Sequence, residues 1–179
     1  MAERVRETVA RAAGAAAAVT VEDAVLHALR ARHGLDPKDV RYLHPARTVL
    51  ILVDDAGVRD ADVLVAGALL ESWHPGLAAA RAAGTTRAQG ILAAVPLPGG
   101  DAELLRERLV TADADARLIA VVERLDHARH LHQYPQGEWQ PAYRELEAAY
   151  LPVAEWIGGP VGARFRRWAD AFARRLRAR

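Results

Sequence analysis

Residues 116–133, "ARLIAVVERLDHARHLHQ", decide the fold class of this chain. Leu118, Val122 and Leu125 recur at the three- and four-residue spacing of one face of an α-helix, which differs from the alternation of a strand. Asp113 or Asp115 can accept hydrogen bonds from the first backbone N–H groups of such a helix. The stretch is therefore predicted to be a capped helix.

Most of the remaining chain has the same organisation. Short turn sequences separate segments of about 9 to 20 residues, which suits helices better than strands. Asp101 and Thr85 precede two further segments as candidate caps. Residues 48–57 and 90–100 are short apolar runs that fit a buried strand as well as a helix, so the pattern alone leaves an α/β fold open.

Composition narrows the class of protein. A chain of 179 residues without cysteine predicts one domain over 1–179, with neither disulfides nor a thiolate zinc site. Its net charge of +1 gives no general attraction for nucleic acid, and the run "AAGAAAAV" near the start is too short to span a bilayer. We therefore expect a cytoplasmic protein with neither a membrane nor a nucleic-acid partner. Abundant alanine and arginine, with Lys38 as the single lysine, are typical of a GC-rich bacterial genome.

The C-terminal residues 161–179 form a predicted amphipathic, basic helix. Phe165, Trp168, Phe172 and Leu176 recur at helical spacing, and arginines occupy most other positions. This pattern favours a helix that docks on the rest of the protein and exposes a basic face. A membrane-surface or nucleic-acid element is the alternative.

Two groups of polar residues stand out as candidate site residues. "LVAGALLESWHPG" (64–76) is an apolar helix pattern that ends in Glu71, Ser72 and His74. Glu123 and His127 lie four residues apart on the predicted helix of residues 116–133, so both occupy one face. Each group has a simple structural interpretation, as an ion-paired helix end or a solvated helix face, and each could also contribute to an active site.

Five segments in a fixed order resemble the HD-domain superfamily, and the small guanosine polyphosphate (ppGpp) 3'-pyrophosphohydrolases in particular. The resemblance covers about residues 22–160 and implies an all-α bundle of about eight to ten helices, with residues 48–57 helical. The segments are "AVLHALRARHG" (24–34), "RYLHPARTVLILVDDAG" (41–57), "DADVLVAGALLES" (60–72), "LLRERLVTADADARLIAVVERLDHAR" (104–129) and "AYLPVAEWIGG" (149–159).

The resemblance implies a divalent-metal site, usually for manganese. The first family ligand falls on His44, the histidine–aspartate pair on Glu71 and Ser72, and the later aspartate on Glu123. We therefore expect Mn²⁺ or another divalent metal to be held by His44, Glu71 and Glu123. Serine replaces a carboxylate here and is a poor ligand for such ions.

Other family positions also differ. The asparagine that contacts nucleotide falls on His127, whereas Arg124 and Arg129 match the family pattern. The acidic pair that positions the attacking water falls on Pro75 and Gly76, so the ancestral hydrolysis is expected to be lost.

Two functions follow as hypotheses. The first is an HD-superfamily phosphohydrolase-like protein with an altered active site, in which Glu71, Glu123 and His127 are the catalytic residues. Arg124 and Arg129 would then contact a phosphorylated nucleotide or another small molecule, because guanidinium groups pair with phosphate oxygens. The alternative is a catalytically inactive regulator that binds a nucleotide or a protein, and the sequence leaves open whether the chain is an enzyme.

Overall fold

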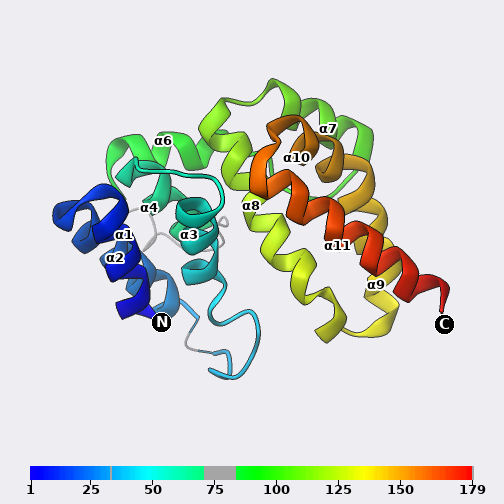
Figure 1. Cartoon of the computed structure of the whole chain (residues 1–179), viewed down its shortest axis with the longest axis horizontal. Helices are drawn as coiled ribbons and strands as arrows, with labels where there is room; N and C mark the ends of the chain where they lie inside the picture. The colour runs from blue at the N-terminus through cyan, green and yellow to red at the C-terminus, as the bar shows by residue number, and fades with distance from the viewer. Residues whose placement is uncertain (33, 71–83, 179) are drawn as a thin grey trace. The chain divides into compact units, whose positions relative to one another are not determined.

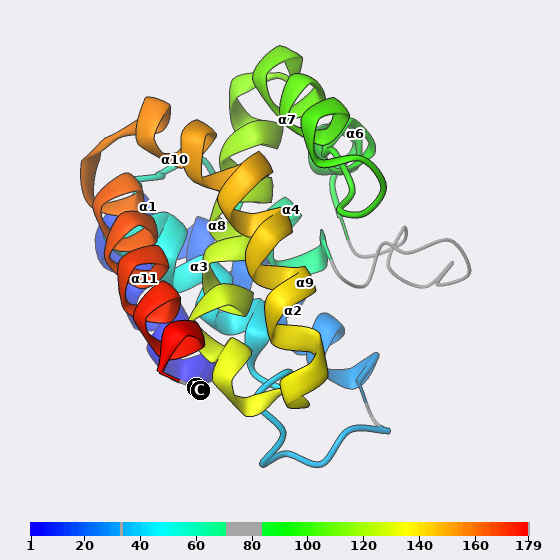
Figure 2. The ribbon, with the colours of Figure 1, turned by 90° about the vertical axis from the view of Figure 1, so that its right-hand side faces the viewer.

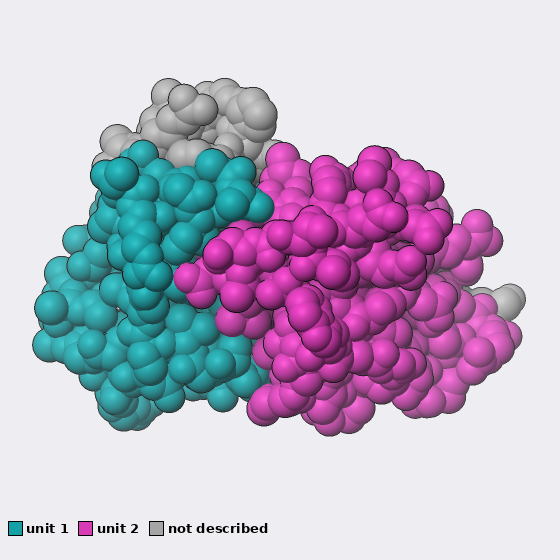
Figure 3. Space-filling view, turned by 90° about the horizontal axis from the view of Figure 1, so that it is seen from above, with its two compact units in different colours: residues 1–94 teal, residues 95–179 magenta. Residues whose placement is uncertain are grey.

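The computed structural model describes residues 1–32, 34–70 and 84–178. Every regular element in these ranges is a helix, and the ranges contain no strand (Figure 1). The predicted all-α class is therefore confirmed. The chain divides into two compact units, Met1–Ala94 and Val95–Arg179, which are coloured separately in Figure 3 and are described one at a time below. The expected single domain over 1–179 stays a prediction.

The helices of the first unit surround α4, Ala61–Leu69, whose residues from Val63 to Leu69 are all buried. α4 packs against three of the other helices, α2, α3 and α6. Asp60 caps it by accepting a hydrogen bond from the Asp62 backbone N–H at 2.9 Å. The remaining helices are α1 (Ala2–Ala13), α2 (Ala15–Arg30), α3 (His44–Asp54) and α6 (Thr86–Ala94).

α3 shows why residues 48–57 resemble a strand in the sequence. All residues from Thr48 to Val53 are buried, so the helix has no polar face to mark its 3.6-residue period. Pro45 in its first turn needs no intrahelical hydrogen-bond donor, which suits a helix start. The helical prediction is confirmed for residues 48–54, whereas residues 55–57 lie beyond the end of α3.

The second unit is built around α8, Ala114–His130, which confirms the helix predicted from residues 116–133. Asp113 caps α8, and Asp101 caps α7 through hydrogen bonds from two backbone N–H groups, as expected. The elements of this unit are α7 (Ala102–Thr111), α8, the 3₁₀ turn η2 (Leu131–Gln133), α9 (Gln136–Glu145), the π-helical turn η3 (Leu146–Tyr150), α10 (Leu151–Ile157) and α11 (Gly159–Arg177).

α11 docks on the second unit, as its amphipathic pattern predicts. It packs beside α8, α9 and α10, and Figure 2 shows it continuing from α10 along α8. Phe165 and Phe172 are buried, and the Phe172 ring centroid lies 5.6 Å from that of Trp139 and 6.1 Å from that of Tyr143 on α9. The apolar face of α11 is therefore part of the core. None of the described helices is long and apolar enough to cross a membrane.

Candidate functional site

The polar face of α8 brings together two of the expected site residues. Glu123 Oε1 lies 3.0 Å from His127 Nε2, one helical turn further along. The Glu123 side chain is only 3% exposed and that of His127 is 21% exposed. The opposite, apolar face of α8 carries the buried side chains of Val122 and Leu125, so the same helix that builds the core aims a carboxylate and an imidazole at one point.

Arg124 holds the Glu123 carboxylate with both arms of its guanidinium group. Its Nε donates to Glu123 Oε2 and its Nη2 donates to Oε1. Such fork-like pairs are the strongest and most directional of the charge-assisted hydrogen bonds. Adjacent residues of a helix point about 100° apart, so this pair requires both side chains to bend toward one another. We call these two hydrogen bonds from Arg124 to Glu123 the fork. Together with His127, the fork occupies three of the roughly four acceptor positions of the Glu123 carboxylate.

The environment keeps Arg124 charged. Burial alone would lower the pKa of its guanidinium group, but the attraction of the Glu123 charge and the hydrogen bonds to that carboxylate outweigh burial and raise it. Tyr150 and Glu145 add smaller contributions in the same direction. Arg124 is therefore positively charged at neutral pH.

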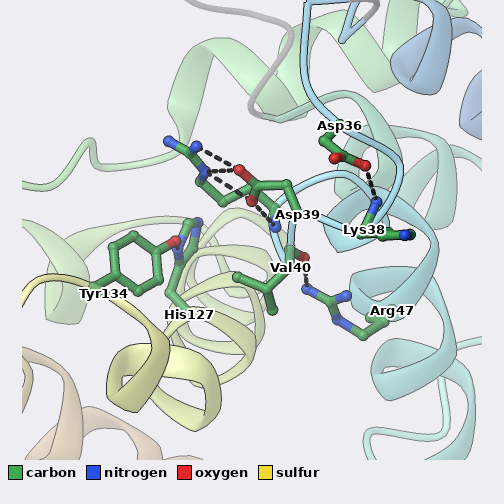
Figure 4. Close-up of polar contacts among 8 residues, drawn as sticks. Asp36, Lys38, Asp39, Val40, Arg47, His127 and Tyr134 are labelled. Carbon is green, nitrogen blue, oxygen red and sulfur yellow. Dashed lines mark hydrogen bonds and ion pairs between the residues drawn. The ribbon is translucent and has the colours of Figure 1, made fainter.

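Two tyrosines that the sequence did not suggest complete this region. The Tyr134 hydroxyl oxygen lies 3.3 Å from His127 Nδ1 and is directed at the ring in Figure 4. Tyr134 is itself held by its backbone carbonyl, which accepts a hydrogen bond from Trp139 Nε1 at 2.8 Å. Tyr150 is fully buried, and burial is the main cause of its raised pKa. The π-helical turn η3 places Tyr150 here, and such turns are frequent at functional sites.

Asp126 is a further buried carboxylate on α8, and it is not among the residues predicted from the sequence. His130 Nδ1 lies 2.7 Å from the backbone carbonyl oxygen of Asp126 and 3.7 Å from its carboxylate. The His130 ring is therefore turned toward Asp126, one helical turn before it. This pair could have been noticed from its four-residue spacing.

His44 begins α3 in the first unit, and its side chain is buried. Its backbone N–H donates to the carbonyl oxygen of Arg41 at 3.2 Å, which ties the helix start to the preceding loop. That loop is braced by ion pairing between Arg41 and Asp39, with Arg41 Nη2 2.5 Å from Asp39 Oδ2. Hydrogen bonds from the side chain and the backbone N–H of Arg41 lower the pKa of the Asp39 carboxyl group to about 2.

A second brace links the same loop to α3. Arg47 Nη2 donates to the Val40 carbonyl oxygen at 2.6 Å (Figure 4). The entry to α3 is thus fixed by polar contacts on both sides of His44.

The other expected site residues are distributed as follows. Glu71, Ser72 and His74 lie outside the described residues. Arg129 is exposed on α8 and, six residues after Glu123, points about 120° away from it. The structure therefore joins Glu123, Arg124 and His127 and separates Arg129 from them.

Glu123 and His127 are chemically suited to share a divalent ion. A carboxylate oxygen and an imidazole nitrogen are ligands for Mn²⁺, Zn²⁺ and related ions. Two ligands about 2.1 Å from one ion and at right angles to each other lie about 3 Å apart, which matches the spacing of Glu123 Oε1 and His127 Nε2. The donor pair thus fits part of a metal site, and Arg124 competes for the same carboxylate.

Comparison with protein-family models, curated proteins and solved structures finds no match for this chain. The resemblance to the HD-domain superfamily stays a prediction based on the order of its sequence motifs.

Proposed function

We propose that this protein is a metal-dependent phosphohydrolase-like member of the HD-domain superfamily with an altered active site. The proposal depends above all on one observation, the 3.0 Å approach of Glu123 Oε1 and His127 Nε2 on the buried polar face of α8. His44 and Glu71 are the further ligands that the family resemblance implies.

Each residue of α8 has a defined role in this proposal. Glu123 supplies the negative charge and an oxygen ligand, and His127 supplies Nε2. The Tyr134 hydroxyl oxygen would accept a hydrogen bond from His127 Nδ1–H and so fix the ring in the tautomer that leaves Nε2 available. A bound divalent ion would polarise a phosphoryl oxygen and lower the pKa of a bound water. Arg124 lies next to this position and could turn from Glu123 to a phosphate oxygen of the substrate.

The fork between Arg124 and Glu123 favours a second candidate function. A carboxylate that already accepts three hydrogen bonds has little remaining capacity for a cation. If the fork is permanent, the site holds no metal. The protein would then be a catalytically inactive regulator that binds a phosphorylated ligand or a protein.

Calorimetric titration of metal-stripped protein with MnCl₂ separates the two functions. The first predicts one Mn²⁺ per chain, with an affinity at least about 10-fold lower in Glu123→Gln and in His127→Ala. His44→Ala tests the ligand implied by the family resemblance. His132→Ala is the matched control, because His132 is exposed on η2.

The absence of binding heat in the parent protein would reject the metal-dependent function. Binding of inorganic pyrophosphate in the presence of EDTA would then support the regulator. Saturable Mn²⁺ binding that all three substitutions leave unchanged would place the metal elsewhere and would also reject the proposed site.

A further inference from the structure

α11 concentrates positive charge that the net charge of the whole chain conceals. The chain as a whole carries +1, but α11 contains six arginines and a single acid, Asp170, so the remainder is net acidic. We call these arginines the arginine ridge: Arg164, Arg166, Arg167, Arg174, Arg175 and Arg177, all of them exposed.

The arginine ridge is presented by a rigid helix. The opposite face of α11 is locked into the core of its unit by Phe165 and Phe172. The ridge runs from Arg164 to Arg177, about 20 Å along α11, so it spans several phosphate spacings of a nucleic-acid strand. Its apolar face is already covered, which removes the surface that an amphipathic helix inserts into a lipid bilayer.

An exposed tryptophan lies in the same unit. The side chain of Trp156 on α10 is 61% exposed, more than any other large hydrophobic residue among those described. The guanidinium carbon of Arg117 lies 4.3 Å from its ring centroid. Arg117 is fixed in turn, because its Nη1 donates to the carbonyl oxygens of Val110 at 2.7 Å and Ala112 at 3.2 Å. The indole ring is therefore supported from one side and largely open to solvent.

Trp156 and the arginine ridge lie on two neighbouring helices of the second unit. α10 and α11 pack against each other, and an ion pair between Glu155 and Arg166 joins them. Glu155 directly precedes Trp156 in the sequence, so this ion pair lies one residue from the exposed indole along the chain.

We propose that Trp156 and the arginine ridge together bind single-stranded nucleic acid, with a base stacked on Trp156 and phosphates held by the ridge. Proteins that bind single strands combine these two features, an aromatic platform for bases and a cationic track for the backbone. Guanidinium groups suit phosphate because they pair with two oxygens at once. An acidic protein would satisfy the arginines but would not require an open indole supported by a fixed guanidinium group.

The test uses the full chain in EDTA, so that it is independent of metal binding at Glu123 and His127. Fluorescence anisotropy measures binding of a labelled 12-nucleotide single strand, as RNA in one arm and DNA in the other. Trp156→Ala is expected to weaken binding about 5- to 100-fold, the loss of one stacked base, whereas Trp156→Phe retains most of the affinity. Arg167→Ala and Arg174→Ala should each reduce the slope of log K against log[salt] by about 0.7.

Arg106→Ala is the matched control, since this arginine of the same unit, with a side chain 42% exposed, lies on α7, outside the ridge. It should leave the affinity for the oligonucleotide unchanged. The proposal is overturned if Trp156→Ala and the ridge variants bind the oligonucleotide as the parent does. It is also overturned if poly-glutamate or phosphatidylserine vesicles compete as well as an unlabelled strand, because the ridge would then recognise charge alone. Stronger binding of RNA than of DNA, or the reverse, supports the proposal and identifies the strand.

Discussion

Substitution of Arg124 by glutamine tests whether the fork stabilises a buried carboxylate. The Glu123 side chain is 3% exposed and that of Arg124 is 20% exposed, so the variant leaves a buried negative charge with His127 as its remaining neighbour from this site. Removing one partner of a buried ion pair costs about 3–5 kcal/mol. Because Arg124 is partly exposed, we expect a loss of about 2–4 kcal/mol in the free energy of unfolding.

The same variant also reports on the proposed metal site. Without the fork, Glu123 is released for the ion, so MnCl₂ should stabilise Arg124→Gln more than the parent. A ligand present at 100 times its dissociation constant adds about 2.7 kcal/mol to the free energy of unfolding, enough to recover most of the loss. If MnCl₂ raises the free energy of unfolding of both proteins by the same amount, Arg124 and the metal do not compete for the Glu123 carboxylate.

Urea unfolding followed by tryptophan fluorescence, with EDTA or with MnCl₂, gives these free energies. Arg129→Gln is the control, because Arg129 is exposed on the same helix and its loss should change stability by less than about 0.5 kcal/mol. The double variant Glu123→Gln/Arg124→Gln removes both charges and should be more stable than Arg124→Gln alone. The reasoning fails if Arg124→Gln matches the parent, or if the double variant loses the sum of the two single losses.

Two further predictions concern the second unit. A Cβ atom at Gly162 would lie 2.6 Å from the Ala154 carbonyl oxygen, whereas one at Gly137 meets nothing within 4 Å. In urea unfolding, Gly162→Ala should therefore be less stable than Gly137→Ala by about 1–3 kcal/mol, and equal stability would refute a tight crossing of α10 and α11. Burial, with the hydrogen bond from Tyr143 to Glu147, raises the pKa of Tyr143 from 10.0 to about 12. Because the pKa of Tyr143 is higher in the folded protein than in the unfolded chain, the protonated tyrosine contributes its full stabilisation below pH 10. This contribution is lost as the pH rises toward 12. The free energy of unfolding of Tyr143→Phe should therefore fall less steeply than that of the parent between pH 10 and 12. A larger rise of tyrosinate absorbance at pH 10 in the parent than in Tyr143→Phe would contradict this, because Tyr143 would then already be ionised at that pH.

Local signals in the sequence were sufficient for much of the fold. Asp101 and Asp113 cap the helices that follow them, as their positions predicted. Thr85 accepts a hydrogen bond from the Ala88 backbone N–H at 3.1 Å at the start of α6. Caps can be predicted because the side chain bonds to its own neighbours two or three residues away. The apolar run in α3 could not be assigned in this way, because a helix buried on all sides has no polar period.

In the candidate site, too, only part of the arrangement could be predicted from the sequence. The four-residue spacing of Glu123 and His127 predicted that they share a face of α8, and the structure places them 3.0 Å apart. The fork from Arg124 was not predictable, because adjacent residues of a helix point in different directions.

Tertiary structure alone decided which other groups reach this face. Tyr134 approaches His127 after the chain turns through η2, and Tyr150 is placed by a π-helical turn. The sequence by itself therefore determined the helices and the residues that one helix aligns. Contacts between different elements, or between residues on different sides of one helix, depend on how the chain bends and packs. They leave no short-range capping pattern and no apolar periodicity in the sequence from which they could be predicted.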